Sequence, residues 1–396
     1  MTDVVREALT TTVDLPQYST PEAVVAELQP EYPVYCVRPH AIHRAARLFL
    51  DKFPGDTLYA VKCNPAPHML RALYHAGIRH FDTASLAEIA LVSQLFPDSV
   101  CYFMHPVKAR SAIAEAHSRY GVRHHVVDHP SELQKISEVI PANRDVVILV
   151  RLAVHHTGAV YDLSSKFGTS VEGTLALLAK IESLGFSAGL CFHVGSQCLD
   201  PDAYRLAMES VAEVRARSPI ALGCIDVGGG FPGRYLNDPV EGVSSYIDAV
   251  IAAARGLGEI DESRLFCEPG RGLTEGGESL ITQVQLRKGS ALYLNDGIYG
   301  SMNEEQTGLR RPHRVVETRN FSSQRTQFTV YGPTCDSLDI LPDPVELPAD
   351  LREGDWIEFG AMGAYGLACR TAFNGFFPNT FVSVENEFEA DASPVG

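Results

Sequence analysis

A single lysine ends an apolar run early in the chain. The stretch LYAVKCNP, residues 58–65, reads as a buried strand until Lys62, and a turn-prone Asn-Pro pair follows. Burying an ammonium group costs free energy unless the group is paired, neutralised or used in chemistry. Lys62 alone leaves two interpretations open: an ion pair, or a nucleophilic lysine that bonds to a carbonyl group.

Two glycine-rich segments indicate where an anion binds. DVGGGFPG (226–233) and EPGRG (268–272) each follow a short apolar run. Consecutive glycines expose backbone N–H groups that can surround a phosphate, and Arg271 adds a charged donor. A triple glycine by itself is more typical of a tight turn. Its position after the seventh of eight apolar runs, beside Gly270 and Arg271, favours a phosphate site.

A lysine that faces a phosphate site suggests pyridoxal phosphate held as a Schiff base. Glu268 supports this hypothesis, because a carboxylate beside the pyridine nitrogen keeps the ring protonated and able to withdraw electrons from the substrate's α-carbon. His193, in FHVGSQ, is expected to stack on the ring, with Ser196 near the phosphate. A purely structural histidine is the alternative interpretation of His193.

Short and long apolar patterns alternate from about residue 58 to 268, and these elements must position the side chains. Helical patterns such as PDAYRLAMESVAEVRARS have apolar positions every three or four residues and separate short strand-like runs. The eight runs are 58–62, 78–82, 101–105, 123–128, 146–151, 189–194, 223–227 and 264–268. This alternation predicts an α/β protein with a (β/α)8 TIM-like barrel; a doubly wound sheet is the alternative.

The polar residues that end these runs decide in favour of the barrel. Nearly every run ends on one: Lys62, Asp82, His105, Asp128, Arg151, His193 and Glu268. In a barrel the carboxyl ends of the strands meet on one face, where the active sites of this fold lie. We therefore expect these side chains to surround one site.

The pattern of predicted elements changes after Glu268. Strand-like segments such as QFTVYGP and DWIEFG alternate with turns there, and no long helical pattern occurs. We predict a cofactor-binding barrel at residues 36–275 and a β-rich domain made of residues 1–35 together with 276–385. The final residues, 386–396, are predicted to be a disordered tail.

Composition excludes several classes of function. A net charge of −16 and a pI near 5.3 argue against nucleic-acid and anionic-membrane partners. The nine cysteines include no C-x-x-C pair, so we expect reduced thiols and no metal site. The chain shows neither a signal peptide nor an apolar run of the roughly 18 residues that a membrane helix needs. These features predict a soluble, cytoplasmic protein.

Ten motifs in order between residues 59 and 376 resemble one known family. They are YAVKCNP, FDTAS, SKFG, FHVGSQC, DVGGGFPG, EPGR, NDGIYGS, GPTCDSLD, MGAY and FNGF. The set is similar to the fold-type III pyridoxal-phosphate-dependent decarboxylases of ornithine, diaminopimelate and lysine, and most closely to the ornithine decarboxylases. This resemblance implies an alanine-racemase-like barrel followed by a β-rich C-terminal domain.

The resemblance implies a role for each matching residue. The implied cofactor-binding set is Lys62, Asp82, Arg151, His193, Ser196, Gly228, Gly229, Gly230, Glu268, Gly270, Arg271 and Tyr365, with Glu88 supporting the lysine. The implied catalytic set is Lys62, Cys335, His193 and Glu268. Within it, Lys62 resembles the lysine that bonds the cofactor and Cys335 the cysteine that returns a proton to the α-carbon after carbon dioxide leaves.

The resemblance also implies a homodimer with shared active sites. In the family the cysteine matched by Cys335 and the aspartate matched by Asp336 come from the neighbouring subunit, whereas Asp296 resembles an own-subunit carboxylate for the substrate's distal amine. Cys335, Asp296 and Asp336 would then bind a small cationic amino acid. The implied reaction converts L-ornithine to putrescine, or L-lysine to cadaverine, in polyamine biosynthesis.

Other functions remain open. Diaminopimelate decarboxylase is the nearest rival, because an arginine of GLRRPHR can pair with a second carboxylate on the substrate. A non-catalytic homologue that binds a regulator, like the antizyme inhibitors, is the alternative from another class. The matches are loose at 155–165 and 304–315, and the family's ornithine enzymes usually read Phe-Glu-Asn-Met-Gly-Ala-Tyr-Thr where this chain has FGAMGAYG (359–366).

Overall fold

The computed structural model describes residues 15–154, 158–161, 166–236, 238, 240, 242–256 and 261–390. The chain forms two compact units. The barrel unit comprises Ala45–Pro232 and Pro239–Gly272, and the sheet unit comprises Val13–Arg44, Gly233–Asp238 and Leu273–Gly396. Residues 1–14 of the predicted β-rich domain, part of the loosely matching stretch 155–165 and the end of the predicted tail lie outside the described residues.

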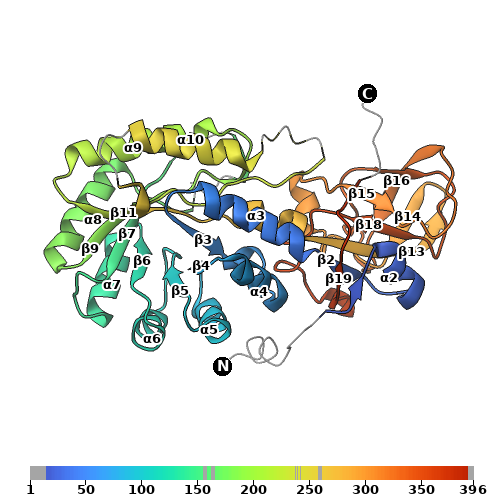
Figure 1. Cartoon of the computed structure of the whole chain (residues 1–396), viewed down its shortest axis with the longest axis horizontal. Helices are drawn as coiled ribbons and strands as arrows, with labels where there is room; N and C mark the ends of the chain where they lie inside the picture. Colours follow the sequence, from blue (N-terminus) through green and yellow to red (C-terminus); the bar gives the residue numbers. More distant parts are fainter. Residues whose placement is uncertain are drawn as a thin grey trace. The chain divides into compact units, whose positions relative to one another are not determined.

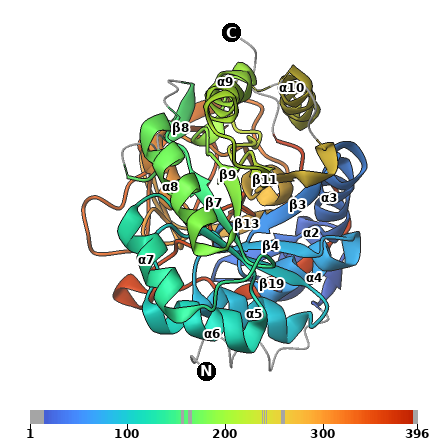
Figure 2. The same cartoon turned by 90° about the vertical axis from the view of Figure 1, so that its left-hand side faces the viewer.

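The barrel unit contains a closed ring of eight parallel strands, which confirms the predicted fold (Figure 2). In chain order they are β3 (Asp56–Ala60), β4 (His80–Thr83), β5 (Val100–Phe103), β6 (His124–Val127), β7 (Val147–Arg151), β9 (Ser187–Cys191), β11 (Leu222–Asp226) and β12 (Leu265–Cys267). The order of pairing follows the chain, and β12 closes the ring on β3. A doubly wound sheet is therefore wrong for this chain.

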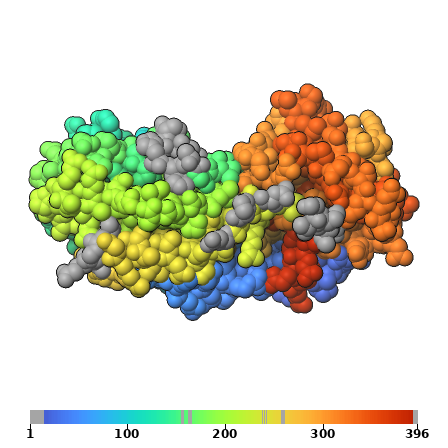
Figure 3. Space-filling view, turned by 90° about the horizontal axis from the view of Figure 1, so that it is seen from above, coloured from blue at the N-terminus to red at the C-terminus, as the bar shows by residue number. Residues whose placement is uncertain are grey.

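Helix α3 (Pro39–Lys52) precedes the first strand of the ring, and the short helix α11 (Arg271–Thr274) follows the last. In the described part of the chain, seven helices lie between consecutive strands of the ring (Figure 1): α4 (Pro67–Ala76), α5 (Leu86–Leu95), α6 (Arg110–Tyr120), α7 (Pro130–Val139), α8 (Val171–Leu184), α9 (Asp202–Arg217) and α10 (Val243–Gly256). Local sequence sets their ends. Ser170 caps α8 by accepting the Gly173 N–H, and Gly185 ends it at φ 87°, which a residue with a side chain rarely adopts. Helices α9 and α10 lie side by side on the surface of the barrel unit (Figure 3).

The barrel interior is filled by apolar side chains from nearly every strand. One buried cluster contains Leu58, Tyr102, Met104, Val126, Leu149, Cys191, Cys224 and Phe266. Strands buried on both faces read as continuous apolar runs rather than alternating ones, which is why their positions were predictable. The interior is thus a packed core, and chemistry is confined to the ends of the strands.

The sheet unit is built around the long strand β13 (Glu278–Lys288). It pairs with β2 (Val34–Val37), with β14 (Ala291–Leu294) and with β18 (Trp356–Phe359). The strands β1 (Gln17–Tyr18), β15 (His313–Val315), β16 (Arg325–Tyr331), β17 (Val345–Pro348) and β19 (Thr380–Val384) complete the sheet. The short helix α2 (Pro21–Leu28) contributes Val24 and Val25 to a hydrophobic core that also contains Ile281. The β-rich domain predicted after Glu268 is thus confirmed.

The first residues of the predicted C-terminal tail make contacts within the sheet unit. Asn386 accepts a hydrogen bond from Arg38 Nε at 2.8 Å, and Glu387 forms an ion pair with Arg44 at 2.8 Å. The ring of Phe388 lies against the backbone of Gly360. The prediction of a tail from residue 386 was wrong at least through Phe388, because a short segment with side chains of this size can pack and pair on a neighbouring sheet.

Phe388 also explains one departure from the family pattern. A Cβ placed on Gly360 would lie 2.6 Å from the Phe388 ring, so the glutamate usual at this position does not fit. We expect Gly360→Ala to lower the free energy of unfolding by about 1–3 kcal/mol, as overpacking usually does. In a Phe388→Ala background the same change should cost much less. Urea unfolding of the four proteins measures this coupling, and equal costs in both backgrounds would contradict the packing.

Candidate active site

Lys62 lies at the mouth of the barrel and is paired. It occupies a short 3-10 turn, η1 (Val61–Cys63), just past the end of β3, rather than the strand itself as predicted. Its Nζ donates to Asp82 Oδ2 at 2.7 Å, and the Lys62 side chain is 43% exposed whereas Asp82 is 2% exposed. The pairing of Ala60 with Asp82 across β3 and β4 brings the two side chains together. A buried carboxylate therefore holds an accessible amine at the barrel mouth.

Glu88 stands beside this pair as part of a helix cap. Ser85 Oγ accepts the Glu88 N–H at 3.2 Å, and Glu88 Oε2 accepts the Ala84 N–H at 2.6 Å, which together form a capping box at the start of α5. Burial raises the pKa of Glu88 to about 7, and the charge of Asp82 adds to the shift while Lys62 opposes it. The carboxyl thus titrates near neutrality next to Lys62.

His193 presents a neutral imidazole. Its Nδ1 accepts the Gly195 N–H at 3.0 Å, which places the ring proton on Nε2. Burial lowers the pKa of His193 well below its usual range, and the charges of Arg151 and Lys62 lower it further. A Cβ on Gly229 would lie 2.8 Å from Nε2, so only glycine leaves this side of the ring open.

The glycine loop after β11 has the conformation that its sequence requires. Gly228 has φ 69° and Gly230 has φ 103°, values that favour glycine. The Gly228 N–H donates to Asp226 Oδ1 at 2.8 Å, and Tyr204 Oη donates to the Gly229 carbonyl at 3.0 Å. The loop is therefore held from both sides, by a strand-end carboxyl and by a residue of α9.

Two carboxyl groups are buried at the ends of β11 and β12. Burial raises the pKa of Asp226 to about 6 and that of Glu268 well above its usual range, and the charge of Asp226 adds to the shift of Glu268. Glu268 Oε1 is buried and has no hydrogen-bond partner among the described residues. Sequence reasoning missed Asp226, although its place at the end of the seventh strand resembled that of the residues it did select.

The remaining predicted residues of the barrel unit lie at the same strand ends. Arg151 is the last residue of β7, and its guanidinium lies 5.4 Å from the ring centre of Phe167. Ser196 starts the short strand β10 (Ser196–Cys198), which pairs with β8 (Ala159–Tyr161). Arg271, 3% exposed, begins α11 directly after Gly270. These residues therefore lie on or directly after strands of the barrel unit, and their shared role in one site stays a prediction.

These residues fit pyridoxal phosphate. The buried Glu268 Oε1 is an acceptor placed for a protonated ring nitrogen, and the Gly229 position, which any Cβ would fill, keeps space beside His193. Lys62 supplies an accessible amine, and the loop Gly228–Gly230 with Arg271 supplies backbone and guanidinium donors for a phosphate. Every part of the cofactor thus has a chemically suitable partner in the barrel unit.

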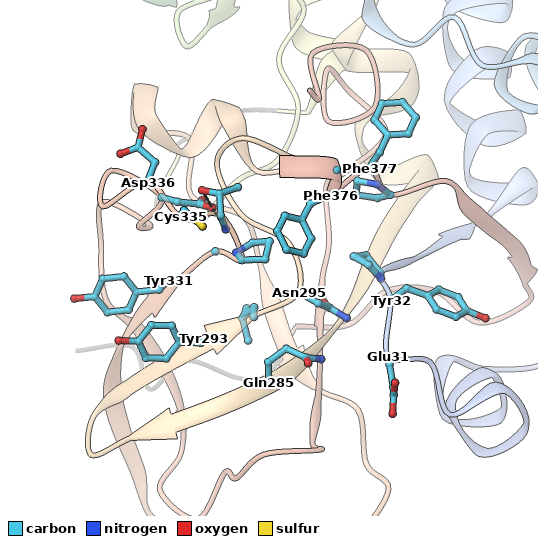
Figure 4. Close-up of a pocket in the computed structure, with 18 of the residues that line it drawn as sticks. Glu31, Tyr32, Gln285, Tyr293, Asn295, Tyr331, Cys335, Asp336, Phe376 and Phe377 are labelled. Atoms are coloured by element: carbon cyan, nitrogen blue, oxygen red, sulfur yellow. Dashed lines mark hydrogen bonds between the residues drawn. The ribbon is translucent and has the colours of Figure 1, made fainter. Parts of the chain in front are cut away.

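Cys335 and Asp336 line a cavity of about 840 Å³ in the sheet unit (Figure 4). Aromatic side chains form part of the cavity wall: Tyr293 and Tyr331 stack with ring centres 5.0 Å apart, and Phe376 and Phe377 also line it. Cys335 is exposed. Tyr299 Oη donates to Asp336 Oδ2 at 2.5 Å, and this hydrogen bond lowers the pKa of the Asp336 carboxyl. The ionised carboxylate of Asp336 and the thiol-bearing Cys335 therefore line the same cavity.

Asp296 and Tyr365 are also in the sheet unit, in different settings. Asp296 is 2% exposed and accepts the N–H groups of Gly297 and Ser301, while burial raises its pKa to about 6. Its carboxyl is thus part of a buried turn. The charge of Asp296 also acts on Arg370, a residue that sequence reasoning missed. Tyr365 has φ 59° in the turn after β18. The substrate role of Asp296 and the phosphate role of Tyr365 stay predictions.

The arginines of GLRRPHR already have acidic partners within the sheet unit. Arg310 pairs with Asp343 at 2.7 Å. Arg311 is buried 3.6 Å from Glu304 and 3.8 Å from Glu305, and none of its guanidinium nitrogens makes a hydrogen bond among the described residues. Arg314 pairs with Glu22 and Glu358, both at 2.7 Å. Each of the three arginines therefore has an acidic neighbour, and only Arg311 keeps its hydrogen-bond donors unused.

None of the helices in the described part of the chain has the length and apolar content to cross a bilayer. The nine cysteines are all free, and only Cys335 and Cys369 among them are exposed. The prediction of reduced thiols is consistent with this arrangement.

Comparison with known proteins identifies the relatives of this chain. Residues 40–275 match the family described as pyridoxal-dependent decarboxylase, pyridoxal binding domain. Lysine/ornithine decarboxylase of Selenomonas ruminantium is 32% identical over 85% of this chain and 85% of its own length. Antizyme inhibitor 2 of Xenopus laevis is 32% identical over 83% of this chain and 75% of its own length. The crystal structure of the Paramecium bursaria Chlorella virus arginine decarboxylase superposes with a TM-score of 0.82 and 26% identity, covering 92% of this chain and 100% of that one.

Proposed function

Because the chain belongs to the pyridoxal-dependent decarboxylase family, we propose that it removes the α-carboxyl group of a basic L-amino acid, with L-ornithine as the preferred substrate and putrescine as the product. L-Lysine, giving cadaverine, is the second substrate. The observation that carries the proposal is the barrel mouth, where an accessible Lys62 amine held by Asp82 stands at the same strand ends as the buried, unpartnered Oε1 of Glu268.

Different residues of the barrel unit bind different parts of the cofactor. Lys62 would bond it, the loop Gly228–Gly230 and Arg271 would hold its phosphate, and neutral His193 would lie against its ring without adding a competing charge. When bound, pyridoxal phosphate supplies an electron-withdrawing ring that stabilises the charge left on the α-carbon. Glu268 would accept a hydrogen bond from the ring nitrogen and keep that nitrogen protonated.

The sheet unit supplies the groups that determine substrate specificity and that protonate the α-carbon in the last step. Asp336 is ionised beside the Tyr299 hydroxyl, which suits a distal ammonium group, because a buried cation needs an opposite charge. Cys335, next to it in the chain and exposed, returns a proton to the α-carbon. We propose that both residues come from the second copy of a homodimer.

Diaminopimelate is a poorer candidate substrate. It carries a distal carboxylate that would need a cation. Of the arginines suited to it by sequence, Arg310 is paired with Asp343, and the charge of buried Arg311 is already balanced by Glu304 and Glu305. Freeing a buried arginine from its carboxylates would leave those carboxylates uncompensated, which is costly.

A regulator-binding homologue without activity is the alternative from another class, because an antizyme inhibitor is among the relatives. Such a protein has no need for the Lys62–Asp82 pair or for the neutral His193 beside an open glycine position. Both features are present in this chain and support catalysis.

A product assay combined with mapping of the bound cofactor tests the proposal. The purified protein, loaded with pyridoxal phosphate and reduced with borohydride, is expected to carry the cofactor on Lys62, as mapped by peptide mass. Offered L-ornithine, L-lysine, L-arginine and meso-diaminopimelate, it should show its highest kcat/KM with L-ornithine and release putrescine.

The matched control is Lys166→Arg, a change of another barrel-unit lysine, whose Nζ lies 5.1 Å from the ring centre of Phe167. This variant should still be labelled on Lys62, whereas Lys62→Arg should lose the label. A cofactor trapped on another lysine, or a preference for diaminopimelate, would refute the assignment. A labelled Lys62 with no turnover of any amino acid would favour the regulator-binding alternative.

A further inference from the structure

The turn that carries Tyr365 contains two residues with strained backbone. It spans residues 360–366, directly after β18, and within it Ala361 has φ 53° and Tyr365 has φ 59°. Left-handed backbone is unfavourable for residues with a Cβ, and alanine lacks the short polar side chain that lets asparagine adopt it more readily. Such conformations persist only where the surrounding structure enforces them. The 360–366 turn therefore depends on contacts from outside itself.

Backbone contacts hold the middle of this turn. The Met362 N–H donates to the Glu278 carbonyl at 2.9 Å, and the Gly363 N–H donates to the Glu275 carbonyl at 3.2 Å. A Cβ on Gly363 would lie 1.8 Å from the carbonyl oxygen of Thr274, so the two backbones approach as closely as a glycine permits. The turn is thus fixed to the segment that ends α11 and leads into β13.

The ring of Phe388 holds the start of the turn. A Cβ on Gly360 would lie within 2.6–2.8 Å of three atoms of this ring, so the ring occupies the space that a side chain at position 360 would take. The guanidinium of Arg38 lies 5.9 Å from the centre of the same ring. The side chain that is missing at position 360 is therefore replaced by one from the C-terminal segment.

Neighbouring contacts keep Phe388 in this place. Arg38 is buried and bridges two elements, because its Nη2 donates to Glu358 Oε1 at 2.8 Å and its Nε donates to the Asn386 carbonyl at 2.8 Å. Glu387 accepts two hydrogen bonds from the guanidinium of Arg44, at 2.8 and 3.0 Å. Residues 386–388 are thus anchored to β18 and to the start of α3 within the sheet unit.

We propose that Phe388 is a positioning residue for the cofactor phosphate: its ring holds the 360–366 turn in the conformation that presents Tyr365. The inference rests on the proposed function, in which Tyr365 binds that phosphate. Removing the ring leaves a void beside Gly360, into which the strained backbone at Ala361 can relax. The relaxation would displace Tyr365, four residues further along the same turn.

Two ligands that differ only in the phosphate test this role without any turnover. Pyridoxal phosphate and pyridoxal both carry the aldehyde that Lys62 would bond, so the ratio of their dissociation constants isolates the phosphate contacts. Absorbance titration of the full-length apo-protein measures both constants. Phe388→Ala is expected to raise the dissociation constant of pyridoxal phosphate about 10-fold, the scale of one hydrogen bond to a charged group, and to leave that of pyridoxal unchanged.

The matched control is Phe321→Ala. Phe321 is another half-buried phenylalanine of the sheet unit beside an arginine, with the guanidinium of Arg319 4.1 Å from its ring centre, but it lies between β15 and β16. Both dissociation constants should stay unchanged in this variant. Tyr365→Phe should weaken pyridoxal phosphate at least as much as Phe388→Ala does. Adding Phe388→Ala to Tyr365→Phe should then change little, because a positioning residue acts through the group that it positions.

A loss confined to pyridoxal phosphate in Phe388→Ala, nearly absent in the Tyr365→Phe background and in the control, supports the proposal. Unchanged affinity for pyridoxal phosphate, equal losses for both ligands, or full additivity with Tyr365→Phe overturns it. If Phe388→Ala does not fold, Gly360→Ala, which displaces the ring, is judged by the same outcomes. Normal binding of pyridoxal phosphate by Tyr365→Phe overturns the inference together with the phosphate role of Tyr365. A failure of the proposed decarboxylation is seen separately, in the amine assay.

Discussion

Mixing two inactive variants, Lys62→Ala and Cys335→Ala, is expected to restore activity to about a quarter of the active sites. The reason is that the two residues belong to different units and must act on one α-carbon. In a symmetric dimer with shared sites, each mixed dimer has one site that carries both defects and one that carries neither. Random exchange makes about half of the dimers mixed, so about a quarter of all sites are intact.

Exposed apolar side chains around Cys335 suggest a surface that a second copy covers. Leu338 is 67% exposed, and Phe373, Phe376 and Phe377 are 43%, 42% and 47% exposed. Large apolar groups gathered at one place on a surface usually mark an interaction site. The segment carrying these phenylalanines also holds Cys335 in place, because Asn374 Oδ1 accepts the Cys335 N–H at 2.9 Å.

The control for the mixing experiment uses two defects of the same unit. Lys62→Ala mixed with Glu268→Gln should recover no activity beyond that of the separate variants, because each site of a mixed dimer then keeps one defect. Subunit exchange is confirmed by mass spectrometry of differently tagged chains. If exchange occurs and the Lys62→Ala and Cys335→Ala mixture stays inactive, each site is built within one chain and the shared-site dimer is refuted.

Replacing Glu268 with glutamine is expected to lower kcat about 100-fold or more while the cofactor stays bound. A glutamine side chain has the same shape, but its amide does not carry the negative charge that keeps a ring nitrogen protonated. The burial of Glu268 makes this charge effective, since little solvent screens it. Single-turnover decarboxylation of L-ornithine measures the loss, and the absorbance of the bound cofactor confirms occupancy.

Glu88→Gln is the comparison for this variant. Glu88 is a second carboxyl of the barrel unit with a raised pKa, yet its Oε2 is occupied by the Ala84 N–H, which a glutamine oxygen also accepts. The expected loss in kcat is well under tenfold. Near-normal turnover by Glu268→Gln, or equal losses in the two variants, would show that Glu268 does not face the ring nitrogen.

Sequence alone determined the barrel and most of its site. Eight apolar runs separated by helical periodicity are a local property, readable without any contact between distant residues. The polar residues that end those runs, such as Lys62 and Glu268, were readable for the same reason, because all strand ends of a parallel barrel share one face. The glycines at 228 and 230 were also readable, since their backbone conformations exclude most other residues.

Tertiary structure alone decided which polar groups are paired. The sequence separates Asp226 from Glu268 by about forty residues, and only the pairing of β11 with β12 places the charge of Asp226 where it raises the pKa of Glu268. The arginines at 310 and 311 read as free cations until the fold placed Asp343, Glu304 and Glu305 beside them. Likewise, the sequence placed Phe388 in a predicted disordered tail, whereas in the structure its ring packs against Gly360. The physical reason is that periodicity depends on neighbours in the chain, whereas the ionisation and availability of a side chain depend on neighbours in space.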